Sequence, residues 1–315
     1  MTQDNANEIT LTRDYSAPLI SVWDAFTDAA QASQWWGPRG FSITTHAKDL
    51  RPGGIWHYTM HGPDGVDYPN KTRYHEVVEH ARLVYDHGGN DEQKPMFRVT
   101  VVFTAVDGGT RMDMTMRFPS PEALEAARAI IKKAGGESTW DRLAEYLEKQ
   151  RSGKETFVLN RSFAAPLEQV FEAWTDPKRL AQWSPPVGFS MEFIRADIRP
   201  GGGTFSVMTD GKGAAMYGRA AYLIIEKPNR IAYTQQFCDQ EERVSRHPLS
   251  PTWPATMLTE IQLAAEGPDQ TRVTLTWTPY GTVDATELAT FVNARGGMTQ
   301  GWTGSLHKLE TYLAR

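Results

Sequence analysis

The sequence is almost devoid of cysteine, since Cys238 is the only one in 315 residues. A lone cysteine cannot form an intrachain disulfide, and it leaves no cysteine-based metal site available. The chain also has no uninterrupted apolar run of about 18 residues, the length that a membrane-spanning helix needs. Its N-terminal stretch, MTQDNANEIT, lacks the basic start and the apolar run of a secretory signal peptide. These absences predict a cytoplasmic protein with no membrane insertion.

Positive charge is also in short supply. The 33 lysines and arginines are outnumbered by 38 aspartates and glutamates, which gives a formal net charge of -5. Nucleic acids and anionic membranes are bound by clustered lysine and arginine side chains, and the sequence has no such cluster. We therefore expect no nucleic-acid partner. The remaining composition, 40% hydrophobic and 23% charged residues, is typical of a globular protein.

The chain contains an internal repeat. The stretch DLRPGG, from Asp49 to Gly54, returns as DIRPGG from Asp197 to Gly202. At the same offset, RDYSAPLISVWDAFTD (residues 13–28) matches RSFAAPLEQVFEAWTD (residues 161–176) at eight of sixteen positions. Three of the mismatches exchange one aromatic residue for another. A period of half the chain is far longer than a solenoid repeat, so each half is expected to be a complete domain.

The domain boundaries follow from this duplication. About 150 residues is a common size for one domain, and the polar stretch EKQRSGKETF lies between the two copies. We predict a first domain at residues 1–150 and a second at residues 154–315. Duplicated domains often pack about a pseudo-twofold axis, as the subunits of a homodimer do. The tandem chain is therefore predicted to be a monomer whose domains pack as a pseudo-dimer.

Each copy shows the same order of predicted elements. A short alternating strand leads to Ala-Pro and then to a helix whose apolar residues recur at helical spacing. Asp28 and Asp176 are placed to cap a second short helix. The Pro-Gly-Gly of the repeated motif predicts a tight turn between two strands. About six antiparallel strands then lead to a long closing helix, so the order predicts an α+β domain with its sheet curled around that helix.

Several motifs together resemble a known family. They are APLxxV[WF]xA[FW]TD, a tryptophan before a Gly/Pro stop, D[LI]RPGG, GPDG at Gly62 and SPTWP at Ser250. In this combination the chain is similar to the family named for homology to the activator of the heat-shock-protein-90 ATPase, within the START-like (SRPBCC) superfamily. The resemblance covers both halves. It implies two tandem helix-grip domains, each a curved antiparallel sheet wrapped around a long C-terminal helix, with an apolar cavity between sheet and helix.

The functions that the resemblance implies are diverse. Members of the superfamily include lipid carriers, hormone receptors and polyketide cyclases. The co-chaperone of the family name pairs one such domain with a different N-terminal domain, whereas this chain has two copies of the same domain. The copies also differ from each other, since YPNKTRY in the first stands where the second has MYGRA with Gly218. We therefore expect the two cavities to have diverged.

Aromatic residues are the candidate ligand contacts. The chain has 10 tryptophans, 11 tyrosines and 13 phenylalanines, many of them on predicted strand faces. Core packing explains such residues in any globular domain, and a hydrophobic pocket with a few polar groups explains them as well. Both interpretations stay open. The predicted cavity residues are Trp35, Trp56, Tyr58, Met60, Phe118, Trp140, Trp183, Phe205, Tyr217, Tyr233, Phe237, Trp253, Trp277 and Trp302.

Metal and catalytic sites find less support in the sequence. His57 and His61 share a strand face opposite Trp56, so we expect both histidines on the outside of the first sheet. Two histidines on one strand are more typical of solvated surface than of a zinc site, which needs three or four converging ligands. The sequence shows no catalytic triad, phosphate-binding loop or dinucleotide fingerprint. We predict neither a metal nor a cofactor.

The function predicted from the sequence is binding of a small hydrophobic or aromatic ligand in the cavity between sheet and closing helix. Two alternatives stay open. One is an enzyme of the polyketide cyclase or hydratase type, which requires a titratable group in the same cavity. The other is a co-chaperone that stimulates a heat-shock-protein-90 type ATPase.

Overall fold

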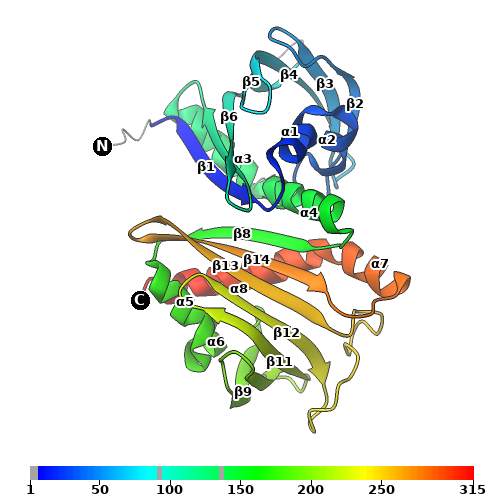
Figure 1. Ribbon diagram of the computed structural model, residues 1–315, viewed down its shortest axis with the longest axis vertical. Coiled ribbons are helices and arrows are strands. Elements are labelled where there is room, and N and C mark those ends of the chain that lie inside the picture. The colour runs from blue at the N-terminus through cyan, green and yellow to red at the C-terminus, as the bar shows by residue number, and fades with distance from the viewer. Residues whose placement is uncertain (1–5, 91–93, 135–137) are drawn as a thin grey trace. The chain divides into compact units, whose positions relative to one another are not determined.

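The computed structural model describes residues 6–90, 94–134 and 138–315 (Figure 1). The chain divides into two compact units, Met1–Gly153 and Lys154–Arg315. Within the described residues, each unit holds a seven-stranded antiparallel sheet and four helices. None of these helices is both long enough and apolar enough to cross a membrane.

The elements follow one another in the same order in both units, as the repeat predicts. Those of the first unit are β1 (Glu8–Tyr15), α1 (Leu19–Thr27), α2 (Ala29–Trp35), β2 (Ser42–Lys48), β3 (Ile55–His61), β4 (Asp67–Val78), β5 (Arg82–Gly89), β6 (Phe97–Val106), β7 (Gly109–Arg117), α3 (Pro121–Ala134) and α4 (Ser138–Ser152). Those of the second unit are β8 (Phe157–Phe163), α5 (Leu167–Thr175), α6 (Pro177–Trp183), β9 (Ser190–Ala196), β10 (Gly203–Thr209), β11 (Ala215–Glu226), β12 (Arg230–Cys238), β13 (Met257–Gly267), β14 (Gln270–Pro279), α7 (Ala285–Asn293) and α8 (Arg295–Leu313).

The two sheets also share their strand order. It is β1-β7-β6-β5-β4-β3-β2 in the first sheet and β8-β14-β13-β12-β11-β10-β9 in the second. The register matches as well, since Tyr85 pairs with Val99 in one sheet and Tyr233 with Thr259 in the other. One face of each sheet, the inner face, packs against the helices, and Figure 1 shows α8 running along the second sheet. The structure confirms an α+β fold with two tandem copies of one domain.

The short helices α2 and α6 begin where the sequence predicts. Asp28 accepts a hydrogen bond of 2.8 Å from the backbone of the first turn of α2, and Asp176 accepts two from the start of α6. These caps satisfy backbone donors that a helix leaves unpaired at its start. Both helices end in a tryptophan, Trp35 or Trp183, whose indole N–H donates to a carbonyl of the preceding helix at 2.9 Å. Capping and this hydrogen bond fix the two short helices against each other.

The repeated Pro-Gly-Gly motif forms the predicted turn between neighbouring strands. In the first unit Gly53 has a φ of +82°, a left-handed conformation that glycine adopts without strain. The next residue, Gly54, is constrained by contact, because a Cβ there would lie 2.2 Å from the carbonyl oxygen of Asp49. Gly202 stands in the same position, with the carbonyl oxygen of Asp197 also 2.2 Å away. Backbone geometry therefore explains why this motif occurs in both copies.

Each unit has its own hydrophobic core between the sheet and the helices. In both cores a tryptophan of the closing helix stacks on the last aromatic residue of the first helix. Trp140 stacks on Phe26 with ring centroids 6.2 Å apart, and Trp302 stacks on Trp174 at the same distance. A smaller cluster forms in the first unit where Phe118 packs under α3. The stacked pairs join the closing helix to the rest of each core.

We expect Gly202→Ala to lower the free energy of unfolding by about 2 kcal/mol or more, because the new methyl group would collide with a backbone carbonyl. Gly296→Ala is the matched control, since nothing lies within 4 Å of a Cβ at that position of α8 and alanine is the better helix former. Urea denaturation of the full chain measures both variants. Equal stability of the two would show that the turn tolerates a side chain.

Candidate ligand-binding site

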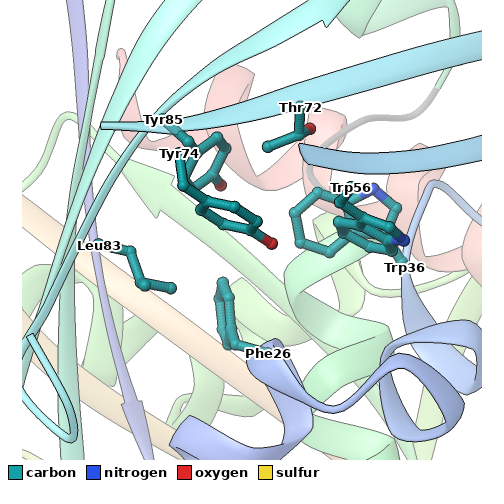
Figure 2. A pocket seen from close by; sticks show the side chains of 7 residues that line it. All are labelled: Phe26, Trp36, Trp56, Thr72, Tyr74, Leu83 and Tyr85. Atoms are coloured by element: carbon teal, nitrogen blue, oxygen red, sulfur yellow. The ribbon is translucent and has the colours of Figure 1, made fainter. Parts of the chain in front are cut away.

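The first unit encloses a small cavity between its inner face and its helices. The cavity volume is about 10 Å³, which is room for about one water molecule. Figure 2 shows the aromatic side chains around it, with Tyr74 pointing towards the indoles of Trp36 and Trp56. The lining residues are Phe26, Trp36, Trp56, Thr72, Tyr74, Leu83 and Tyr85. The chain's own side chains thus fill almost all of this interior.

Trp36, Trp56 and Tyr58 form an aromatic triad that occupies the space beside β3. All three side chains are buried, and the ring centroids are 4.9 Å apart for the two tryptophans and 4.3 Å apart for Trp56 and Tyr58. The Trp36 indole donates a hydrogen bond to the Tyr58 hydroxyl at 3.3 Å. Burial raises the pKa of Tyr58 to about 12, although hydrogen bonds from Trp36 and Thr72 oppose this shift. The triad is therefore uncharged at neutral pH.

Lys48 of β2 extends along the triad. Its ammonium nitrogen lies 3.9 Å from the centre of the Trp56 ring and donates to the Phe26 carbonyl at 2.8 Å. Burial lowers the pKa of Lys48 to about 7, against a smaller opposing effect of nearby Asp28. The second unit has Ala196 at the equivalent register position. This buried amine is therefore particular to the first unit.

His87 is an inner-face residue that is not among the predicted cavity residues. It follows Tyr85 by two positions on β5, so the two side chains share a face. Its ring centroid lies 6.3 Å from that of Trp36 and 5.0 Å from that of Phe97. Burial lowers the pKa of His87 to about 4, so the imidazole is neutral at pH 7. The repeat indicates that this position differs between the units, because RLVYDHGG aligns with RIAYTQQF and places Gln235 at the position of His87.

The loop after α2, residues 36–41, is fastened to the closing helix of the first unit. Arg142 of α4 donates to three carbonyl oxygens of this loop at 2.8, 2.9 and 3.0 Å. Arg39 of the loop makes two hydrogen bonds of 2.9 and 2.5 Å to Glu145 of α4, and both side chains are largely buried. Two-point pairing of this kind is among the stronger polar contacts in proteins. The loop therefore closes the interior beside the aromatic triad.

The second unit lacks the aromatic triad. Its equivalent positions hold Ser184, Thr204 and Ser206, three small hydroxyl residues. The inner face is accordingly more open, because Ser206, Ala220 and Tyr233 are half-buried whereas their counterparts in the first unit are buried. Phe193 of β9, which replaces a threonine of β2, adds bulk at the edge of the sheet and still leaves these side chains accessible to solvent.

The equivalent loop of the second unit, residues 184–189, is held by other contacts. Ser305 and Lys308 of α8 donate to the carbonyl oxygens of Ser184 and Pro185, each at 2.9 Å. Val187 stands where the first unit has the ion-paired Arg39, and 72% of this residue is exposed. An exposed valine thus replaces a buried ion pair at this loop.

Tryptophans gather on the other side of the second interior. The Trp302 ring lies 6.2 Å from Trp174 and 5.4 Å from Trp277, and Trp253 lies 6.2 Å from Trp277. The indole N–H groups of Trp174 and Trp277 are buried, and neither has a hydrogen-bond partner among the described residues. Buried donors without a partner are rare in folded proteins. These two donors can therefore serve an acceptor that the chain does not supply.

A cleft of about 270 Å³ opens at the adjoining ends of β11 and β12. Phe237, an inner-face residue of β12, forms part of its wall and lies 4.5 Å from the ring of His247. Arg246, which is paired with Glu287 of α7, also lines the cleft. The lining residues are Ala215, Met216, Tyr217, Phe237, Cys238, Asp239, Gln240, Ser245, Arg246 and Pro248. The cleft thus reaches the edge of the inner face from the surface.

Two tyrosines, Tyr222 and Tyr233, lie on the inner face of the second unit with ring centroids 5.2 Å apart. Burial raises the pKa of both phenols, to about 12 for Tyr233. Both are therefore neutral at pH 7, and the amide of Gln235 beside them does not titrate. The inner faces of β11 and β12 thus offer hydrogen-bonding groups without an acid or base that works near neutral pH.

Most of the predicted cavity residues face an interior. In the first unit these are Trp35, Trp56, Tyr58, Met60 and Trp140, and in the second Trp183, Tyr233, Phe237, Trp253, Trp277 and Trp302. Phe118 lies apart from them, in the small cluster under α3, because β7 ends at the preceding residue.

Phe205 and Tyr217 lie on the outer face of the second sheet instead of in its interior. Their rings stack 6.0 Å apart. Thr204 pairs with the inner-face residue Ala220, so its neighbour Phe205 points to the opposite side. Aromatic character alone predicts these residues in the cavity, whereas the register of the repeat, which aligns Phe205 with the outer-face residue His57, predicts Phe205 on the outside.

His57 and His61 lie on the outer face of the first sheet, as expected, and so does His46. The ring of His61 hydrogen-bonds Asp67 at 2.6 Å, and that of His46 hydrogen-bonds Thr59 at 2.8 Å. Within residues 6–90, 94–134 and 138–315, no group of three or more histidine, cysteine or acidic side chains is arranged to hold a metal ion.

Known proteins share this architecture. The family described as Activator of Hsp90 ATPase homolog 1-like protein matches the chain at residues 16–148 and again at residues 164–314. The chain belongs to this family. Because the two matches cover most of its length, it is a tandem member of the Activator of Hsp90 ATPase homolog 1-like family. No curated protein matches the chain.

Solved structures similar to this tandem family member span about half of it. Protein NE0264 from Nitrosomonas europaea is 24% identical and covers 47% of this chain and 99% of its own, with a TM-score of 0.43. Protein Ms6760 from Mycobacterium smegmatis is 28% identical and covers 44% of this chain and 90% of its own, with a TM-score of 0.40. A family protein from Silicibacter pomeroyi is 24% identical and covers 50% and 97%, with a TM-score of 0.40.

The Lys48 amine should make the stability of the first unit depend on pH. An unfolded lysine keeps its proton up to about pH 10.5, whereas folded Lys48 loses it near pH 7. Between these values the unfolded state binds more protons, so the free energy of unfolding rises with pH. We expect Lys48→Met to abolish this rise in urea denaturation between about pH 7 and 9.5.

Lys212→Met, which removes an exposed lysine before β11, is the control and should keep the wild-type slope. An unchanged slope in Lys48→Met would mean that the Lys48 amine stays hydrated in the folded protein.

Proposed function

We propose that the chain binds a small hydrophobic or aromatic molecule, and that the second unit holds it between the inner face of its sheet and α8. The observation that supports this proposal most strongly is the replacement of the aromatic triad by Ser184, Thr204 and Ser206 on an otherwise repeated backbone. Removing large side chains from a fixed backbone leaves volume behind unless the surroundings collapse. The half-buried state of the inner-face residues beside these positions argues against collapse.

The surroundings of this space suit a ligand. Trp253, Trp277 and Trp302 supply flat apolar surface, and Ser206, Thr259 and Gln235 supply a few polar groups. Predominantly apolar walls with a small number of polar groups are typical of small-molecule sites. The 270 Å³ cleft at the ends of β11 and β12 gives the space a route to the surface through Phe237.

The first unit is proposed to serve as a closed scaffold. Its cavity of about 10 Å³ is too small for an organic ligand. Arg142 and the Arg39–Glu145 pair hold the adjacent loop against α4, so opening the interior would break several buried polar contacts. Ligand binding by the chain is therefore assigned to one unit of the two.

Binding is favoured over catalysis by the chemistry of the inner face. A general acid or base works best with a pKa near the working pH. In the second unit the tyrosines of the inner face have raised pKa values, and Gln235 stands where the first unit has His87. The residues of this site are suited to holding and orienting a molecule.

Filling the second interior tests the proposal. We expect Ser206→Phe to weaken binding of isopropylnaphthalene, a hydrocarbon probe, by at least about tenfold, because the new ring takes the place of the ligand. Val207→Phe is the matched control, since the same ring is added one residue further along β10 on the outer face. Calorimetric titration of the full chain measures both variants, and circular dichroism verifies that they fold.

Wild-type affinity in Ser206→Phe would place the probe elsewhere. Failure of the wild-type chain to bind either this hydrocarbon or its ketone analogue, acetylnaphthalene, would remove the proposed function.

The reciprocal change tests the assignment of the first unit as a closed scaffold. Tyr58→Ser empties part of the aromatic triad and should lower the free energy of unfolding by about 3–5 kcal/mol, the usual range for deleting a large buried side chain. The equivalent Ser206→Ala should change stability by less than about 1 kcal/mol, because Ser206 is half-buried. Urea denaturation compares the two. Similar losses would mean that the two interiors are packed alike.

A further inference from the structure

The second interior differs from the first in polarity as well as in space. At three inner positions the register pairs an apolar residue of the first unit with a polar one of the second. Phe26 corresponds to Trp174, and Val99 and Met116, which pair across β6 and β7, correspond to Thr259 and Trp277 on β13 and β14. Each exchange places a hydrogen-bond donor where the first unit has none.

These donors are costly unless something accepts from them. The side chains of Trp174 and Thr259 are 3% and 0% exposed, and the Trp277 indole nitrogen is also buried. A buried donor without a partner costs about 1–3 kcal/mol. The first unit shows that phenylalanine, valine and methionine fit the same places in this fold without that cost. Packing alone therefore does not explain the polar residues of the second unit.

The unpartnered indoles occupy one part of the interior. Trp174 and Trp277 both contact Trp302 of α8, with ring centroids 6.2 and 5.4 Å away. Thr259 pairs with Trp277 across the strands and with Tyr233 on its other side, and its buried hydroxyl has no hydrogen-bond partner among the described residues. The two indoles thus lie beside the flat apolar surface of Trp302.

Two arginines around this interior are already paired, and Lys308 of α8 donates to the Pro185 carbonyl. Arg246, which lines the cleft, is paired with Glu287. Arg295, whose guanidinium lies 5.9 Å from the Phe291 ring, is paired with Glu155. Burying a carboxylate without a counter-ion would cost far more than burying a neutral acceptor. Indole N–H donors next to arginines that already have a carboxylate partner therefore favour an uncharged oxygen.

Resting on the proposed function, we propose that the ligand of the second unit is a flat, uncharged molecule with a carbonyl oxygen, of the ketone, quinone, ester or amide class. The carbonyl oxygen accepts hydrogen bonds from the indole N–H groups of Trp174 and Trp277, and the flat body of the ligand packs on Trp302. The donors that the folded chain leaves unpaired are satisfied when the ligand is bound.

A pair of probes with the same number and connectivity of heavy atoms tests this assignment. Acetylnaphthalene has a carbonyl oxygen where isopropylnaphthalene has a methyl group, so the two are close in size and differ chiefly in hydrogen bonding. We expect the wild-type chain to bind the ketone about tenfold more tightly than the hydrocarbon. Trp277→Phe and Trp174→Phe, which keep an aromatic ring and remove the N–H, should each reduce this preference to about threefold or less.

Trp140→Phe makes the same chemical change in the first unit and should leave the preference intact. A second measurement does not depend on variants, since the infrared carbonyl stretch of the bound ketone should move to lower frequency than in a dry apolar solvent.

Equal affinities for the two probes, or a preference that survives both substitutions, would overturn the carbonyl assignment and leave hydrophobic binding in place. Failure of both probes to bind would overturn the proposed function together with this inference.

Discussion

The structure depends on covering the concave inner face of each sheet with two short helices and a closing helix. The backbone that does so is nearly the same in both units, because the caps at Asp28 and Asp176, the Pro-Gly-Gly turns and the strand register all recur. A fixed backbone encloses a fixed volume, and protein interiors are packed at nearly crystalline density. The differences between the two units therefore follow from what fills that volume.

In the first unit side chains fill it. The aromatic triad is bulky enough to desolvate its neighbours, which explains why burial lowers the pKa of both Lys48 and His87. The Arg39–Glu145 pair is held away from most of the solvent by the same packing. Such groups are tolerated because His87 is neutral at pH 7, Lys48 can lose its proton near that pH, and Arg39 and Glu145 are paired. A closed interior of this kind leaves no space for a guest.

The second unit uses the same scaffold with the large side chains moved. Aromatic bulk is taken away beside β10 and added at Trp174 and Trp277, on the other side of the interior. The exchange opens the part of the sheet next to the cleft and brings indole donors into the interior. The volume and the polarity of the second interior thus change together. Random substitution in a packed core would not require the two to be coupled.

Most of the fold and part of the candidate site could be predicted from the sequence. The repeat predicted two copies, and the spacing of Asp28 and the glycines of the repeated motif predicted a cap and a turn that depend on local geometry alone. Local patterns do not decide which face of a strand is buried. The prediction that Phe205 and Tyr217 line the cavity is therefore wrong, because the strand register puts both on the outer face of the sheet.

The repeat contained more information than hydrophobicity did. Aligning the halves position by position pairs Trp56 with Thr204 and Tyr58 with Ser206, which signals the loss of the triad without any coordinates. The unpaired state of the Trp174 and Trp277 donors could not be predicted in this way, because it depends on which acceptors the folded chain brings within reach. The sequence pattern predicts where a tryptophan lies. Only the three-dimensional structure shows that its indole N–H has no acceptor within reach.

Duplication gives this arrangement a physical rationale. A core that keeps space and unpaired donors for a ligand sacrifices stability, since both voids and unsatisfied polar groups are destabilising. A single domain must meet the needs of folding and binding with the same side chains. With two copies, one interior can be packed to the limit, as the triad packs the first, while the other retains the openness that binding requires. Under the proposed function, the cost of the second interior is offset when a ligand fills it, because a molecule bound only by the folded state stabilises that state.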